Sequence, residues 1–131
     1  MISVDSNIIL RLILDDDPLQ SGRAKKMVQK HSESDGVYIP TAVLLEVTWF
    51  LKIKKVDIEM IYRIVHNLLN SEGLVFDEKT LLVAALERFK KLKGKVGFAD
   101  CLILESSIKN RCKLFTFDKE LLKSDTLNCF D

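Results

Sequence analysis

Four acidic residues stand out because each lies within or directly after an apolar run. Asp5 follows MISV and Asp118 follows LFTF, while Glu46 lies within TAVLLEVTWFL and Asp100 within GFADCLIL. An unpaired carboxylate in apolar surroundings becomes protonated or costs several kcal/mol, unless a cation compensates it. We therefore expect these four acids to share a partner.

Helical spacing sharpens this expectation for Glu46 and Asp100. On a helix, side chains three and four positions apart are neighbours. Around the two acids these positions hold only uncharged residues: Ala42, Val43, Trp49 and Phe50 for Glu46, and Val96, Gly97, Ile103 and Leu104 for Asp100. Both acids are predicted to lie on apolar helix faces, and Glu46 to be buried.

The elements that must position these acids alternate between strand and helix. Apolar and β-branched runs predict strands at 1–4, 37–39, 74–76 and 113–117, with a possible edge strand at 127–130. Helical periodicity predicts helices at 6–14, 18–29, from 41 onward, 57–69, 78–92 and 98–110, and a helical turn at 118–123. This alternation favours an α/β, three-layer, Rossmann-like fold with a central, mainly parallel sheet of four to five strands flanked by helices.

Parallel sheets of this kind bind ligands at the carboxyl ends of their strands. Asp5 and Asp118 each follow a predicted strand, so we expect both at one edge of the sheet. If the two helical acids also converge there, a hard divalent cation is the plausible means of relieving the repulsion, and oxygen ligands favour Mg²⁺ or Mn²⁺ over zinc. One such ion, or a pair about 3.5–4 Å apart, activates water for phosphodiester hydrolysis. The residues placed to orient the acids or hold waters are Ser6, Asn7 and Thr116.

Purely structural interpretations of the acids stay open. Asp5 and Asp118 are also suited to cap the helices that follow them. Glu46 would equally fit an ion pair with a distant Lys or Arg. Glu105 also has apolar helical neighbours, with only Lys109 nearby to pair, so an acid on an apolar face is not proof of a site.

Composition bounds the class of protein. The chain has 131 residues, 47% of them hydrophobic, so we expect one domain over residues 1–131. A net charge of +1 excludes nucleic-acid binding by bulk electrostatics alone. The three cysteines form no CxxC pair, which indicates reduced thiols in a cytoplasmic protein. Asp5 and Arg11 interrupt the first apolar run, so neither a signal peptide nor a membrane span is expected.

Other chemistry is less well supported. There is no Gly-rich phosphate loop, and His31 and His66 read as surface residues. A phosphatase with an Asp-x-Asp pair needs an acid at position 7, where this chain has Asn7, and a phosphorylated receiver domain needs a strand-end acid near mid-chain. Periodicity leaves open whether Trp49 and its neighbours serve the core or a dimer. The basic run of Lys90, Lys91, Lys93 and Lys95 fits a solvated helix end or contact with a phosphate backbone.

Four motifs, in this order, carry a family resemblance over essentially the whole chain: VDSNIILRLI, IPTAVLLEVTWFLK, GFADCLILESS and FTFDKEL. Together they resemble the PIN-domain ribonucleases, and within them the small VapC-type toxins of prokaryotic toxin–antitoxin pairs. Cys101 departs from the Ala that the family commonly has after its third acid.

The resemblance implies a PIN-like fold and a metal-dependent endoribonuclease. It implies that Asp5, Glu46, Asp100 and Asp118 bind Mg²⁺ or Mn²⁺, supported by Ser6, Asn7 and Thr116. It also implies an RNA substrate, a homodimer, and a cognate antitoxin whose tail enters the acidic cleft. The alternatives are a PIN-domain RNA-processing nuclease without a toxin role and a catalytically silent PIN-fold binding protein.

Overall fold

The computed structural model describes all residues from 1 to 131 as seven helices and five short strands. The helices are α1 (Ser6–Leu14), α2 (Pro18–Ser32), α3 (Thr41–Ile53), α4 (Ile58–Leu69), α5 (Lys79–Lys91), α6 (Phe98–Lys109) and α7 (Lys119–Ser124). The strands are β1 (Ile2–Ser3), β2 (Val37–Tyr38), β3 (Leu74–Val75), β4 (Leu114–Phe115) and β5 (Cys129–Phe130). Every predicted element is present, although α2 continues into the segment from His31 that was expected to be a loop.

The strands all pair in parallel, which confirms the α/β class, but they form two separate sheets. One sheet has the order β1-β2-β3, and the other consists of β4 and β5 alone. The predicted central sheet is therefore divided, with β1 at an open edge. Each strand has only two residues, so few backbone hydrogen bonds define each pairing.

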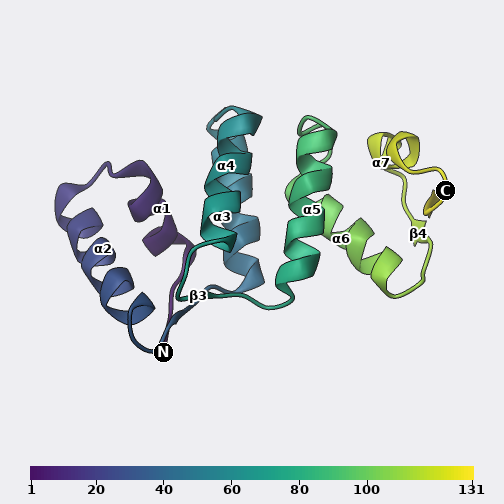
Figure 1. Cartoon of the computed structure of the whole chain (residues 1–131). Helices are drawn as coiled ribbons and strands as arrows, with labels where there is room; N and C mark the ends of the chain where they lie inside the picture. Colours follow the sequence, from purple (N-terminus) through teal and green to yellow (C-terminus); the bar gives the residue numbers. More distant parts are fainter.

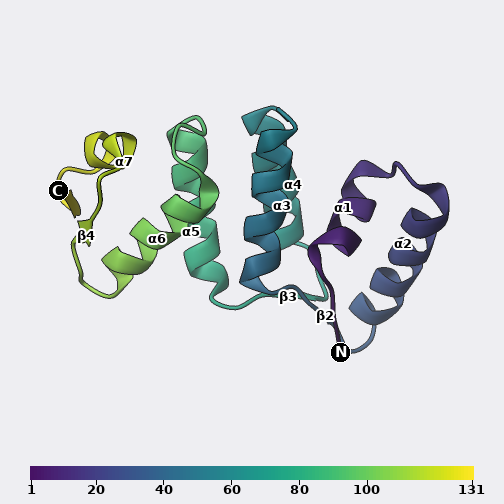
Figure 2. The same ribbon diagram turned by 180° about the vertical axis from the view of Figure 1, so that it is seen from behind.

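The helices follow one another along the molecule in the order of the sequence. In Figure 1, α1 and α2 lie at one end beside β1, the α3–α4 and α5–α6 pairs lie in the middle, and α7 with β4 lies at the other end. The view from behind shows the same order, with β2 and β3 close to the N-terminus and far from β4 (Figure 2). The two sheets are thus separated by the helices between them.

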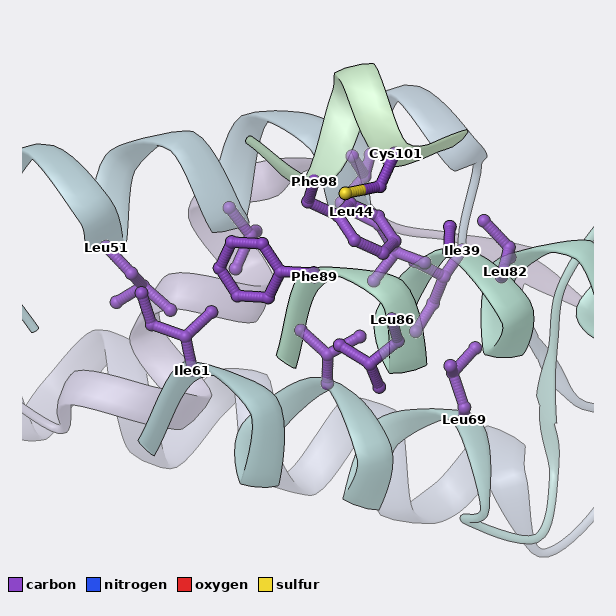
Figure 3. Packing of buried hydrophobic residues seen from close by; sticks show 14 of the residues in the cluster. Ile39, Leu44, Leu51, Ile61, Leu69, Leu82, Leu86, Phe89, Phe98 and Cys101 are labelled. Atoms are coloured by element: carbon purple, nitrogen blue, oxygen red, sulfur yellow. The ribbon is translucent and has the colours of Figure 1, made fainter. Parts of the chain in front are cut away.

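The core runs through the central helices as one cluster of 21 buried residues. Figure 3 shows Leu44 and Leu51 of α3, Ile61 of α4 and Phe89 of α5 directed toward one another. The Phe89 and Phe98 rings meet edge to face, with centroids 6.4 Å apart, and this contact joins α5 to the start of α6. Burial of each such side chain contributes about 1.5–3 kcal/mol, so this cluster fixes where α3 and α6 present their acids.

Three helices begin at an aspartate that caps them. The carboxylates of Asp5, Asp17 and Asp118 accept hydrogen bonds from backbone N–H groups three residues ahead, at 3.1, 3.1 and 2.9 Å. Pro18 follows Asp17 at the first position of α2, where its missing N–H costs nothing. None of the helices combines the length and the apolar character needed to cross a bilayer.

Candidate functional site

Two of the predicted acids meet where α1 begins beside α3. Ser6, the first residue of α1, donates a hydrogen bond from its Oγ to Oε2 of Glu46 at 2.6 Å. Asp5, directly before Ser6, uses Oδ1 to cap α1 through the N–H of Ile8. Both carboxylates are exposed, so this first pair is open to a ligand.

The predicted burial of Glu46 is wrong, because its apolar neighbours do not enclose it. Val43 and Val47 face the core, whereas Trp49 is 66% exposed on the same side of α3 as the acid. The expected ion pair with a distant Lys or Arg is absent as well, and the hydroxyl of Ser6 is the only hydrogen-bond partner of the carboxylate. Exposure to water, with one hydroxyl donor, explains how Glu46 remains without a cation.

The other two acids, Asp100 and Asp118, line a separate pocket of about 340 Å³ beside α3. Asp100 lies in the first turn of α6, and Asp118 caps α7 through the N–H of Leu121. Thr116 accepts a hydrogen bond on its Oγ from the backbone N–H of Asp118 at 3.0 Å, which fixes the turn that carries this acid. The supporting position expected for Thr116 is therefore geometrically sound, acting through the backbone.

The same pocket combines two lysines with an exposed aromatic ring. Lys52 lines it from α3 and donates from Nζ to the carbonyl of Gly94 at 2.7 Å, while Lys95 lines it from the loop before α6. Trp49 is another lining residue. The open choice for Trp49 between core and surface is settled, since Leu51 is buried and Trp49 is exposed.

The predicted convergence of all four acids does not occur within one chain. No three of the His, Cys, Asp and Glu side chains lie close enough to share a metal ion. The cause lies in the sheets: β4 does not pair with β1, so Asp5 and Asp118 follow strands of different sheets rather than neighbouring strands. The carboxylate oxygens suit a hard divalent cation, but this arrangement supplies two half-sites and not a complete one.

Asn7, the remaining supporting residue, faces a different part of the molecule. It is exposed and lines an apolar groove of about 470 Å³ between β1, α1 and α2. It forms no side-chain hydrogen bond to either acid pair in this structure. The structure thus places Ser6 and Thr116 beside acids and Asn7 on the neighbouring groove.

Glu105 shows what the sequence pattern missed. It pairs with Arg88 of α5, Nε to Oε1 at 2.7 Å, and Arg88 also reaches Asp125 at 3.5 Å. Lys109, its expected partner, binds Glu78 instead. Burial opposes ionisation of Asp125, but hydrogen bonds from Asn128 and the charge of Arg88 prevail and lower its pKa below the usual value. This network is structural, because it lies away from both acid pairs.

The cysteines and histidines add no catalytic group. Burial raises the pKa of the Cys101 thiol to about 12, so it remains protonated beside Asp100 at neutral pH. All three cysteines are free of disulfides. His66 is exposed and stacks on Tyr62, and His31 pairs with Asp35. The chemistry of the chain thus rests on its carboxylates.

Parallel strands, helices around them, and acids at two strand ends and on two helices define an α/β protein with an all-oxygen, acidic functional site. A family model described as PIN domain matches residues 2–126, nearly the whole chain, and the protein belongs to the PIN-domain family. A search of the curated proteins found no match. PIN domains are generally nucleases, which are hydrolases of nucleic acid, and they typically use divalent metal ions.

Proposed function

We propose that this protein is a Mg²⁺- or Mn²⁺-dependent endoribonuclease and the toxin of a type II toxin–antitoxin pair. The observation that carries the nuclease part is the PIN-domain match over residues 2–126 in a chain that has all four acids at the expected elements. No other group of nucleophiles or bases competes with these acids. The toxin part is supported by the resemblance of the four motifs to VapC-type toxins.

In this proposal the ion is held by Asp5, Glu46, Asp100 and Asp118. Asp5 and Asp118 use only Oδ1 to cap their helices, which leaves Oδ2 of each without a hydrogen bond. Ser6 orients Glu46, Thr116 holds the turn of Asp118, and Asn7 supports the Asp5 side. A bound divalent ion supplies activation of water and stabilisation of the negative charge that develops on the phosphate.

Single-stranded RNA is the substrate class that best fits the surface beside Asp100. Proteins that bind unpaired RNA stack bases on aromatic rings and contact phosphates with cations. The 66% exposed ring of Trp49 and the lysines at positions 52 and 95 provide both within the pocket that Asp100 and Asp118 line. With a net charge of +1, such local contacts must supply most of the affinity.

The remaining parts of the proposal concern the setting in which the nuclease works. Residues 1–131 act as a single PIN domain, a proposal supported by the one buried cluster that includes residues from β1's end to β5. A homodimer in the cytoplasm, inhibited by a cognate antitoxin that enters the acidic cleft, completes the toxin role.

The first experiment is cleavage of a mixed RNA pool by the purified protein with Mg²⁺, with Mn²⁺ and with EDTA. Cleavage is expected only with metal, and Asp5→Asn, Glu46→Gln, Asp100→Asn and Asp118→Asn are each expected to lower the rate at least about 100-fold. The matched control is Asp57→Asn, because Asp57 precedes α4 but makes no capping hydrogen bond. Equal trace activity in the wild type and all variants would mean contamination, and would favour a catalytically silent binding protein.

The toxin role needs a separate test in cells. Induced expression of the wild type is expected to arrest bacterial growth, and the Asp5→Asn variant is expected to be harmless at the same protein level. Co-expression of the product of an adjacent small gene should restore growth. Active nuclease in vitro without growth arrest would favour an RNA-processing enzyme.

A further inference from the structure

The sheet near the N-terminus ends in an unpaired strand beside an open groove. β1 pairs only with β2, and its other edge has no partner. The groove of about 470 Å³ is lined by β1, α1 and α2 with no residue from β2 or β3, so it lies on the unpaired side of β1. An exposed strand edge is a template for pairing with another strand. The groove is mostly apolar and also carries Arg11 and Arg23.

The opposite end of the molecule carries a strand pair that lacks a sheet to join. β4 and β5 pair only with each other. Phe115, Phe117 and Phe130 gather there, with ring centroids 5.1 and 5.4 Å apart, yet they are 58%, 79% and 47% exposed. A two-stranded sheet is at best marginally stable alone in water. This unit, residues 112–131, also exposes Asp118, Glu120 and Asp131, opposite in charge to the arginines of the groove.

The total surface indicates how much of the chain lacks a partner. A compact monomer of 15.0 kDa is expected to expose about 7,000 Å². This chain exposes 8192 Å², an excess of about 1,100 Å². A standard protein–protein interface covers about 800 Å² on each partner. The excess is therefore of the size that one stable interface would cover.

The chain's own strand pair is held away from its own β1. Arg88 of α5 binds Glu105 of α6 and Asp125 of the C-terminal unit, and Leu121 and Cys129 are buried in the same cluster as Phe89. Figures 1 and 2 place α3, α4, α5 and α6 between the two sheets. Closure within one chain would have to break this packing, whereas docking of a second copy would leave it intact.

We propose that two copies of this chain form a reciprocal dimer in which β4 of each copy pairs with the open edge of β1 of the other. The three phenylalanines then enter the apolar groove. Each half-site of Asp5 and Glu46 is completed by Asp100 and Asp118 of the second copy, so every active site contains residues of both chains. The completed site rests on the proposed nuclease function, whereas the strand pairing does not.

The first arm of the test measures the oligomeric state by light scattering after size exclusion. The wild type is expected to be a dimer, and Phe117→Asp is expected to be a monomer, because it places a charge in the interface. The matched control Met60→Asp changes a 44% exposed residue on α4 and should remain dimeric. A monomeric wild type, or a Phe117→Asp dimer as stable as the wild type, would overturn the proposal.

The second arm uses heterodimers of Asp5→Asn and Asp118→Asn, isolated with two different affinity tags. Each variant alone is inactive under the proposed function. In the reciprocal dimer the heterodimer has one site with both changes and one site with neither, so about half of the wild-type activity should return. Sites built from a single chain would each keep one change, and an inactive heterodimer would overturn the exchange.

The two arms separate the two proposals. If the wild type cleaves no RNA, the nuclease function fails, and loss of the dimer in Phe117→Asp still supports the strand pairing. If the wild type is active but the heterodimer is not, the nuclease function stands and the reciprocal dimer fails.

Discussion

Asp5 and Asp118 each have two uses for one carboxylate. Oδ1 caps a helix, and Oδ2 is left for a ligand. The capping interpretation and the site interpretation of the sequence are therefore compatible, since each uses a different oxygen. Asparagine caps a helix about as well as aspartate but has no charge, which allows the two uses to be separated by substitution.

For Asp5, alanine should destabilise the fold and asparagine should not. Asp5→Ala removes the cap of α1 and is expected to cost about 1 kcal/mol of unfolding free energy, while Asp5→Asn should stay within a few tenths of the wild type. Urea unfolding measures both. Asp17→Ala is the matched control, because it removes the cap of α2 and should lose similar stability while RNA cleavage persists. If Asp5→Asn were as unstable as Asp5→Ala, its loss of activity would carry no information about the site.

Single side chains also show the limits of reading neighbours along a helix. The pattern correctly found that Glu46 has no cation within one turn, but it could not show that the helix face opens to water. For Glu105 it failed in the other direction, because Arg88 lies 17 positions away in sequence and approaches through packing of α5 on α6. Burial and distant partners are set by tertiary structure, which a local pattern does not contain.

At the scale of elements, Arg88 joins three parts of the chain. Its side chain is 19% exposed and lies between Glu105 of α6 and Asp125 before β5. The C-terminal unit contributes few residues to the core, so this ion network is a main reason that it stays on α5. Both acids would be left partly buried and unpaired without the guanidinium.

Arg88→Met is accordingly expected to lower the unfolding free energy by about 3 kcal/mol, because removal of one partner leaves uncompensated charges. Adding Glu105→Gln should recover part of the loss. Lys109→Met serves as the control, since its pair with Glu78 is more than half exposed and is worth less than about 1 kcal/mol. Thermal unfolding of the four proteins provides the comparison. Equal stability of Arg88→Met and Lys109→Met would show that the network does not hold the unit.

The elements themselves were largely predictable. Helices such as α4 have strong apolar periodicity, and the strands follow β-branched runs between turn residues, so type and order were both correct. What the sequence could not show is which strands pair. β4 and β1 have suitable residues for one sheet, but pairing depends on contacts between distant segments, and with two residues a strand carries little register information of its own. The division of the acid site follows from that missing pairing.

At the scale of the whole molecule, several carboxylates link stability to pH. The pKa of Asp15 is lowered by Lys25, that of Asp35 by the chain's amino group and His31, and that of Asp125 by Asn128 and Arg88 against its burial. A lowered pKa in the folded state stabilises the fold above the unfolded value, near 3.9 for aspartate. This stabilisation is lost as the pH falls through the folded pKa values.

We therefore expect unfolding free energy to be steady between about pH 5 and 7 and to fall below about pH 4. Asp125→Asn should be less stable at neutral pH and show a smaller fall, because one of the linked groups is gone. Urea unfolding at pH 6, 4 and 3 measures the difference. An identical fall in the variant would mean that Asp125 is not among the groups responsible.

The order of the helices along the molecule also determines how the chain reaches this structure. Most helix packing joins sequence neighbours: α1 with α2, α3 with α4, α4 with α5, and α5 with α6. Proteins rich in such local contacts fold in microseconds to milliseconds, whereas distant strand pairings form more slowly. Each chain would thus fold quickly into its row of helices, and joining two chains would be a later step whose rate rises with protein concentration. Catalytic power would then appear only after the chains have met, long after each one is individually folded.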